Sequence, residues 1–391
     1  MLDRLDQQPP DALLALIKLY EADPRPTKID LGVGVYRTAD GATPVFRAIK
    51  AAERRLVESQ ETKAYLGPEG DMGFVRALVP HVFGEAGTRD GRIDGMQTPG
   101  GTGAVRLAVA LAKKSGVAKI WMGTPSWPNH AQILNDCGMA AGTFNHATGD
   151  GAADMDALRE VIANAAKDDA VLLHGACHNP TGVDYSNEEW DEIAALVKDK
   201  GILPIIDLAY QGLGDGMDAD AYGLRAVLAA VPEALVAYSC DKNFGLYRDR
   251  VGALYAMGAS AEDTVRIMSN GASLARANWS MPPDHGGAAV RVILEDEALT
   301  ADWLAEVEDM RQRIGQVRAK LAEAGTAGSV DLTPLGAQKG MFAMLPVGKE
   351  QVQALREKHG VYMAGSGRIN VAGLTMGNID AFVAALADVT G

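Results

Sequence analysis

Residues 234–255 read ALVAYSCDKNFGLYRDRVGALY, and this stretch predicts both the fold class and the place of the chemistry. The apolar run Ala234–Tyr238 has the length and the bounding residues of a buried strand. Lys242 follows that run and would lie at the mouth of an α/β sheet, where ligands bind. Arg250 precedes the next apolar run and could return to the same mouth. An amine beside a fixed cation suggests a carbonyl cofactor that carries a phosphate, although two solvated loop charges would give the same local pattern.

Length, composition and charge restrict the class of protein. The 391 residues suffice for about two domains with a large core, and 47% hydrophobic with 23% charged residues is ordinary for a soluble globular protein. A net charge of −14 argues against nucleic acid or an anionic membrane as a partner, because both bind basic surfaces. The three widely spaced cysteines give no disulfide framework. Because we see neither a signal-peptide pattern nor an apolar run of ~18 residues, we expect a cytoplasmic protein.

From about residue 95 onward, short apolar runs alternate with helical patterns. This alternation predicts a mostly parallel sheet covered by helices on both faces. Beyond Pro283, apolar residues follow helical spacing from Leu299 to Leu321, as in a helix that connects two domains. We therefore expect an N-terminal arm at residues 1–10, a large domain at residues 43–309, and a small α+β domain built from residues 11–42 and 310–391.

A glycine-rich loop, Gly100-Gly101-Thr102-Gly103, leads into a predicted helix. Free backbone N–H groups at a helix start, together with the helix dipole, form a natural phosphate site. No Gly-Lys-Ser/Thr follows, so this is not a Walker loop. A dinucleotide site is a weak alternative, since the strand Lys119–Gly123 carries no acidic residue to hold a ribose. A plain strand-to-helix turn is the other alternative.

Two further stretches place polar groups at predicted strand ends. His174, Cys177 and His178 invite a zinc interpretation, but no second ligand cluster follows at zinc-finger spacing, and we expect no metal. Asn179 is better explained as a donor to a ligand oxygen. Asp207 ends a buried strand, where a carboxylate needs a cation such as a protonated ring nitrogen, although a capping role is the alternative.

Two isolated arginines, Arg276 and Arg368, lie among small residues and turns rather than in runs of charge. Guanidinium groups bind carboxylates through two hydrogen bonds, so two such residues could hold a dicarboxylate at both ends. Each arginine alone is a weak signal.

Taken together and in order, these segments resemble the class I aminotransferases of fold type I, in the aspartate and aromatic amino acid subgroup, which use pyridoxal 5′-phosphate. The resemblance implies a large domain with a mostly parallel seven-stranded sheet between helices, a smaller α+β domain, and a homodimer with shared active sites. The matching stretches run from Leu31 to Gly373 and are LGVGVYR, AYLGPEG, TPGGTGAVR, PSWPNH, HGACHNPTG, IIDLAYQG, SCDKNFGLYRDRVGA, RANWSMPPDHG and SGRINVAG.

The resemblance also implies catalytic roles. Lys242 would bind the cofactor covalently and then shuttle the proton. Asp207 would pair with the pyridine nitrogen, with His130 behind it. Asn179 and Tyr210 would hydrogen-bond the phenolic oxygen of the cofactor.

The remaining implied roles concern the cofactor phosphate, the ring face and the substrate. The residues expected to hold the phosphate are Gly101, Thr102, Ser239, Arg250 and, from the neighbouring subunit, Tyr65. Trp127 would stack on the ring and line the substrate site. The residues expected to contact the substrate carboxylates and pocket wall are Arg368, Gly34, Asn179 and, from the neighbouring subunit, Arg276.

Two positions depart from the family pattern. Asp241 stands where the family has serine near the phosphate, and because a carboxylate would repel a phosphate, we expect its side chain to turn towards a cation. Met281 and the nearby Trp279 form a more apolar wall that favours aromatic substrates.

The sequence thus predicts transamination between aspartate or an aromatic amino acid (tyrosine, phenylalanine or tryptophan) and 2-oxoglutarate, which gives a 2-oxo acid and glutamate by a ping-pong mechanism. The alternatives are a β-lyase or decarboxylase on the same fold, a nicotinamide-dependent oxidoreductase, and a binding protein without activity.

Overall fold

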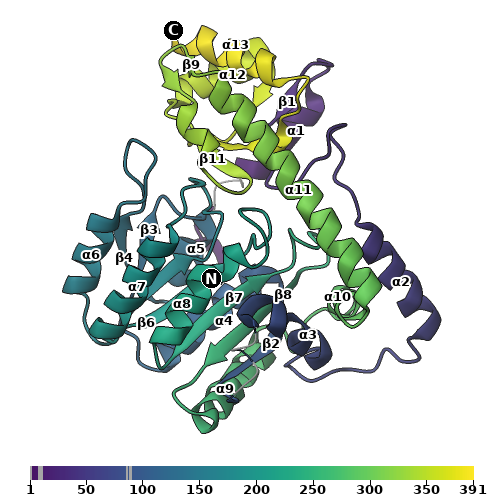
Figure 1. The fold of residues 1–391 in the computed structure, drawn as a ribbon, viewed down its shortest axis with the longest axis vertical. Coiled ribbons are helices and arrows are strands. Elements are labelled where there is room, and N and C mark those ends of the chain that lie inside the picture. Colours follow the sequence, from purple (N-terminus) through teal and green to yellow (C-terminus); the bar gives the residue numbers. More distant parts are fainter. Residues whose placement is uncertain (1, 8–11, 85–86, 88–89) are drawn as a thin grey trace. The chain divides into compact units, whose positions relative to one another are not determined.

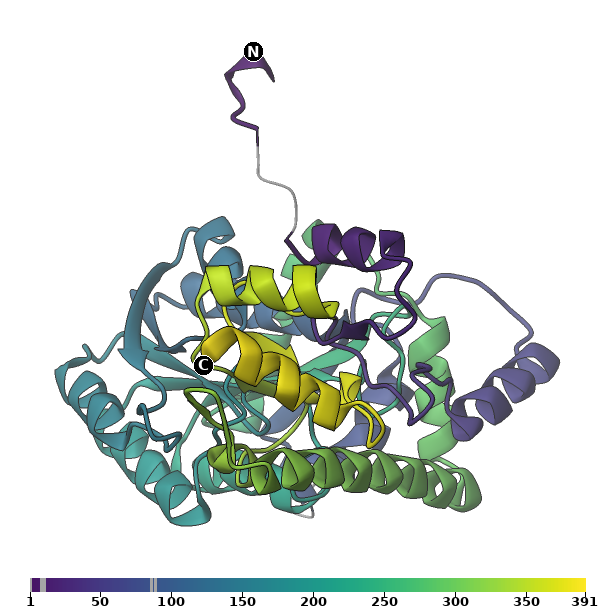
Figure 2. The same cartoon turned by 90° about the horizontal axis from the view of Figure 1, so that it is seen from above.

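The computed structural model describes residues 2–7, 12–84, 87 and 90–391, and Figures 1 and 2 draw its ribbon from two directions. The predicted arm therefore falls partly outside the described residues. The chain forms two compact units. The small unit comprises Met1–Thr43, Ile314–Ala337 and Met341–Gly391, and the large unit comprises Pro44–Arg313 and Gln338–Gly340.

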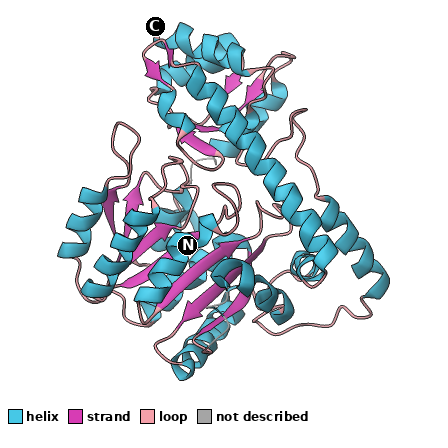
Figure 3. Cartoon of the chain, in the orientation of Figure 1, coloured by secondary structure: helices cyan, strands magenta, loops and turns pink. Residues whose placement is uncertain are grey.

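Within its described residues, the large unit contains one seven-stranded sheet in the order β2-β8-β7-β6-β5-β3-β4 (Figure 3). Only β8 runs antiparallel to its neighbours β2 and β7, and the other adjacent strands are parallel. The predicted mostly parallel seven-stranded sheet is confirmed. The strands are β2 (Ile93–Pro99), β3 (Lys119–Thr124), β4 (Ala140–Asn145), β5 (Asp169–His174), β6 (Leu203–Leu208), β7 (Ala234–Ser239) and β8 (Val251–Met257).

The central strands are buried on both faces, which explains their continuous apolar sequences. In β7, Leu235 and Ala237 belong to a core cluster that also contains α4 and α5 residues. Their neighbours Val236 and Tyr238 are equally buried but point to the opposite face, because side chains alternate along a strand. The helices of the large unit are α2 (Arg47–Ser59), α3 (Met72–Phe83), α4 (Gly100–Lys114), α5 (Pro128–Asp136), α6 (Met155–Asn164), α7 (Asn187–Lys200), α8 (Tyr222–Ala230), α9 (Ala261–Asn278) and α10 (His285–Leu294).

The strand register gathers the polar strand ends at one edge of the sheet. His174 of β5 pairs with Asp207 of β6, and Leu208 pairs with Tyr238 of β7. Ser239 then pairs with Gly252 of β8. Three segments that are distant in sequence thus end side by side, which is where open α/β sheets bind ligands.

The small unit combines short strands with helices. Its strands pair as β1 (Ile29–Asp30) with β12 (Val361–Tyr362), β9 (Thr326–Ala327) with β10 (Val330–Asp331), and β11 (Phe342–Met344) with β13 (Arg368–Asn370). Its helices include α1 (Ala12–Ala22), α12 (Lys349–His359) and α13 (Ile379–Thr390), and α12 lies beside α13 (Figure 2). The long helix α11 (Glu297–Glu323) contributes residues to both units. No helix among the described residues is long and apolar enough to cross a bilayer.

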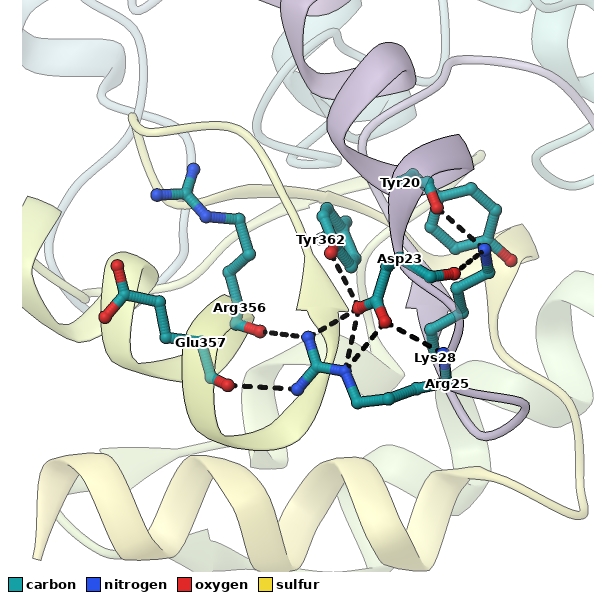
Figure 4. Close-up of polar contacts among 7 residues, drawn as sticks. All are labelled: Tyr20, Asp23, Arg25, Lys28, Arg356, Glu357 and Tyr362. Atoms are coloured by element: carbon teal, nitrogen blue, oxygen red, sulfur yellow. Dashed lines mark hydrogen bonds and ion pairs between the residues drawn. The ribbon is translucent and has the colours of Figure 1, made fainter.

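Hydrogen bonds of the Asp23–Arg25 ion pair fasten the segment after α1 to the C-terminal part of the small unit (Figure 4). Asp23 accepts hydrogen bonds from the Arg25 guanidinium and from the Tyr362 hydroxyl, the latter at 2.7 Å. Arg25 also donates to the carbonyl oxygens of Arg356 and Glu357 at the end of α12, where exposed carbonyls favour a cation. The segment after α1 is thereby held against the end of α12 and against β12.

Candidate active site

Lys242 lies three residues beyond β7, in a tight turn at the carboxyl edge of the sheet. Its Nζ atom is 4.9 Å from the centroid of the Tyr210 ring. Part of the side chain reaches the surface, yet desolvation lowers the pKa of the amine, an effect that Asp241 and Asp207 oppose. A lowered pKa increases the fraction of neutral amine, which is the nucleophilic form.

Asp207 is buried near the end of β6 and is held from one side. Its Oδ2 lies 2.9 Å from His130 Nε2, and the other ring nitrogen of His130 lies 2.9 Å from Ser126 Oγ. Oδ1 of Asp207 is buried and receives no hydrogen bond from any residue that the structure describes. A carboxylate with one anchored and one free oxygen is suited to pair with a protonated ring nitrogen.

Asn179 and Tyr210 form a second polar pair close to the lysine. The Asn179 amide donates to the Tyr210 hydroxyl at 3.3 Å. The Asn179 Oδ1 atom is buried, and no described residue donates to it. Trp127 caps α5, with its ring edge-on to His130 at 5.2 Å between centroids. The structure therefore brings these predicted residues to the same strand ends as Lys242 and Asp207.

The histidines of this edge form a buried row. His174 lies 4.9 Å from His130 and 4.2 Å from His178, whose ring stacks on His146 at 3.5 Å. Burial lowers the pKa of His174 and of His178, and lowers that of His146 to about 4, so these three rings are neutral near pH 7. His130 thus joins this row of rings to Asp207.

The loop around Cys177 is organised by a carboxylate. The backbone N–H groups of Cys177 and His178 donate to Asp184 at 2.6 and 2.8 Å. Potential metal-ligand atoms within 4.8 Å of one another belong to His130, His174 and Asp207, a set that does not include Cys177 or His178. In that group the His130–Asp207 contact is the anchor described above.

The N-terminus of α4 meets Arg250 and Ser239, as expected for a phosphate site. A Cβ atom on Gly100 would lie 2.5 Å from Arg250 Nη2, and one on Gly101 would lie 2.8 Å from the Ser239 Cβ. Thr102 follows in the first turn of α4. Arg250 itself has a positive φ of 54°, a strained conformation that is most often found at functional sites. The glycines at the start of α4 thus let Arg250 and Ser239 lie close to the helix N-terminus.

Gly100→Ala should destabilise the protein by about 2–4 kcal/mol, since it combines a positive φ with a clash against Arg250. Gly116→Ala is the matched control, because Gly116 also has a positive φ but nothing within 4 Å of an added Cβ. We expect about 1–2 kcal/mol for the control. Chemical denaturation of both variants measures the difference, and equal losses would show that Gly100 is needed only for its backbone angle.

Asp241 contacts Arg250, the predicted phosphate-binding cation. Its Oδ2 lies 2.5 Å from Arg250 Nη1, and its Oδ1 accepts a hydrogen bond from the Val251 N–H at 3.2 Å. The expectation that this carboxylate turns towards a nearby cation agrees with the geometry. Desolvation raises the carboxyl pKa, and Lys242 and Arg250 counteract that rise.

Tyr65 and Arg276 lie on exposed segments that meet each other. The Leu66 N–H points at the Met281 sulfur at 3.0 Å, and Arg276 donates to the Ser280 hydroxyl at 2.6 Å. None of the hydrogen bonds or ion pairs between described residues joins Tyr65 or Arg276 to Lys242.

Gln97 hydrogen-bonds both the segment after Tyr65 and the segment after Arg276, and the sequence analysis did not identify it as a functional residue. Its Nε2 donates to the Pro283 carbonyl at 2.7 Å, and its Oε1 accepts from the Asp71 N–H at 2.8 Å. Its partners are 186 and 26 residues away, so no local pattern could identify them. Ser126 was also missed, although its spacing of four from His130 on a helix start was a usable signal.

Gly34 and Arg368 belong to the small unit and meet at Phe342. The Arg368 guanidinium lies 4.7 Å above the Phe342 ring and donates to the Gly32 carbonyl at 3.0 Å. A Cβ on Gly34 would come within 2.9 Å of the same ring. Two of the residues predicted to contact the substrate, Gly34 and Arg368, are therefore neighbours in space.

Comparison with known proteins agrees with this geometry. The family model described as "Aminotransferase class I and II" matches residues 26–386. The chain is 51% identical to a tyrosine aminotransferase of Rhizobium meliloti (strain 1021) and 43% identical to an aspartate aminotransferase of Escherichia coli (strain K12). Those alignments cover 96% and 97% of both chains, respectively. An aromatic-amino-acid aminotransferase from Burkholderia pseudomallei, solved covalently bound to pyridoxal phosphate, superposes with a TM-score of 0.95 at 34% identity over 100% of both chains.

These matches exclude two of the alternatives considered from the sequence, a nicotinamide-dependent oxidoreductase and a binding protein without activity. The chain belongs to the class I and II aminotransferases, in their aspartate and aromatic amino acid subgroup, with pyridoxal 5′-phosphate as the cofactor.

Proposed function

We propose that this aminotransferase exchanges amino groups between 2-oxoglutarate and either aspartate or an aromatic amino acid, in two successive half-reactions. The observation that carries the proposal is the meeting of three features at one sheet edge: the Lys242 amine, the free Asp207 oxygen and the Asn179–Tyr210 pair. The relatives named tyrosine, aromatic-amino-acid and aspartate aminotransferase support the choice of substrates.

The residues at this edge fit the cofactor. The free Oδ1 of Asp207 would accept the pyridinium N–H, and Asn179 with Tyr210 would donate to the phenolic oxygen. The first turn of α4, Ser239 and Arg250 would hold the phosphate. When bound, pyridoxal phosphate supplies an electron sink for the negative charge left on the substrate Cα.

Lys242 would do the proton chemistry. Its Nζ atom would take the proton from the substrate Cα and deliver it to C4′ of the cofactor. Desolvation lowers the pKa of the amine and so raises its neutral fraction, which is the form a base requires. His130 would keep Asp207 in place through the contact of 2.9 Å, and Trp127 would exclude water from one face of the site.

Two arginines would recognise the substrate. Arg368 would bind the α-carboxylate, supported by its stacking on Phe342. Arg276 of the neighbouring subunit would bind a distal carboxylate, and Met281 with Trp279 would accept an aromatic ring. The exposure of Arg276 and of Tyr65, which is 94% accessible, supports a homodimer in which each subunit completes the other's site.

The cysteines support a cytoplasmic location. Cys137, Cys177 and Cys240 form no disulfide among the described residues. Cysteines without disulfides are typical of a reducing compartment, so we place the enzyme in the cytoplasm.

The substrate assignment is tested by comparing kcat/KM for aspartate, tyrosine and phenylalanine with 2-oxoglutarate. Arg276→Ala should lower kcat/KM for aspartate by about 100-fold, because a charge-assisted contact with the distal carboxylate is lost. The value for phenylalanine should fall less than about fivefold.

Arg266→Ala is the control for that experiment, because Arg266 is an exposed arginine on the same helix, α9. It should leave both values unchanged. Equal losses for aspartate and phenylalanine in Arg276→Ala would remove the role assigned to Arg276.

A further inference from the structure

The presumed phosphate site already contains an anion supplied by the chain itself. The Asp241 side chain is only 4% exposed, and its Oδ2 lies 2.5 Å from Arg250 Nη1. The same guanidinium nitrogen also donates to the Tyr247 carbonyl at 3.2 Å. A carboxylate that is this buried is held in its charged form mainly by its cationic neighbours.

The position of this carboxylate coincides with the start of α4. A Cβ added to Gly100 would lie 3.2 Å from Asp241 Oδ2 and 2.5 Å from Arg250 Nη2. The Asp241 N–H donates to Ser239 Oγ at 3.2 Å. The carboxylate therefore shares one space with the three groups assigned to the phosphate, namely the helix start, Ser239 and Arg250.

A phosphate that binds there must share Arg250 with Asp241. At pH 7 a phosphate ester carries close to two negative charges, and two anions a few ångströms apart in a partly desolvated site repel each other strongly. Desolvation also raises the pKa of the Asp241 carboxyl, so its negative charge is already costly before a second anion arrives.

We propose that Asp241 is a positioning residue that competes with the cofactor phosphate for Arg250. It orders Arg250 when the phosphate is absent and weakens the hold on the phosphate when it is present, so that the cofactor exchanges more readily. The inference depends on the phosphate site assigned under the proposed function.

The test measures affinity rather than activity. Full-length protein is freed of cofactor and titrated with pyridoxal 5′-phosphate and, separately, with pyridoxal, which lacks the phosphate. The dissociation constant of pyridoxal divided by that of pyridoxal 5′-phosphate reports the contribution of the phosphate group alone, and it rises when the phosphate is held more tightly. Asp241→Asn keeps the shape of the side chain and removes its charge.

We expect the ratio to rise about tenfold or more in Asp241→Asn, because a repulsion between buried charges is lost. The affinity for pyridoxal should stay within about twofold of the wild type. Asp241→Ser, a smaller neutral side chain, should show the same direction and serves if Asp241→Asn folds poorly. Asp249→Asn removes another carboxylate from the same loop and should leave the ratio unchanged.

An unchanged or lower ratio in the neutral Asp241 variants would overturn the proposal, because Asp241 would then support the phosphate grip or have no part in it. A wild-type protein that binds both aldehydes equally well would instead overturn the phosphate-site assignment, and the proposal with it. The two failures are therefore distinguishable.

Discussion

Lys242→Ala should abolish covalent cofactor binding and lower kcat by at least about 10⁴-fold, since the proposed mechanism assigns both the nucleophile and the base to this side chain. Purified wild-type protein should absorb in the near-ultraviolet or visible range and lose that band on borohydride reduction. The variant should show no such band.

Lys198→Ala is a suitable control, because Lys198 is an exposed lysine of α7 in the same unit. It should retain the band and the activity. A Lys242→Ala variant that keeps the borohydride-sensitive band would move the nucleophile to another residue. A colourless wild type that stays inactive after pyridoxal phosphate is added would contradict the proposed function as a whole.

Trp303→Ala should lower the free energy of unfolding by about 3–5 kcal/mol and also reduce activity. The Trp303 side chain is fully buried, and its ring stacks on Phe244 with 4.3 Å between centroids. Its indole N–H donates to the Asn243 carbonyl at 2.7 Å, directly beside Lys242. The large-to-small change therefore opens a cavity behind the turn that carries the lysine.

Trp303→Phe separates the two effects, because it keeps a stacked ring and removes the donor. We expect a loss of about 1–3 kcal/mol from the unsatisfied carbonyl. Leu304→Ala, at a 37% exposed neighbour on the same helix, should cost far less. Urea denaturation with parallel assays measures both quantities, and equal losses for Trp303→Ala and Leu304→Ala would contradict the buttressing role.

The strands most easily predicted from the sequence are β7 and β8, which are buried on both faces. β7 and β8 consist almost wholly of apolar residues, so a short run with bounding turns was sufficient. β4 could not be predicted in this way, because Ala140–Asn145 is an edge strand with mostly exposed residues and no alternation. β2 was obscured by Gln97 and Thr98, two polar residues that are completely buried.

The residues of the candidate site were predictable where they lie in sequence motifs that follow or end a predicted strand. Lys242, Asp207, Asn179 and Tyr210 each follow or end a strand, and the parallel register then brings them together. A cation beside Asp241 was expected, but that this cation is Arg250 depends on the path of the loop between Asp241 and Arg250. Contacts set by tertiary packing, such as the Trp303 indole on Asn243, leave no trace in local sequence.

Gln97 has a consequence for the design of variant libraries. Because one amide side chain fastens the loop before α3 and the segment before α10, these two loops will tend to change together under selection. A library that randomises Met281 to obtain new substrates should therefore leave Gln97 untouched and sample residues 65–70 in the same clones. Screening either loop alone would miss combinations of substitutions in the two loops, which Gln97 joins.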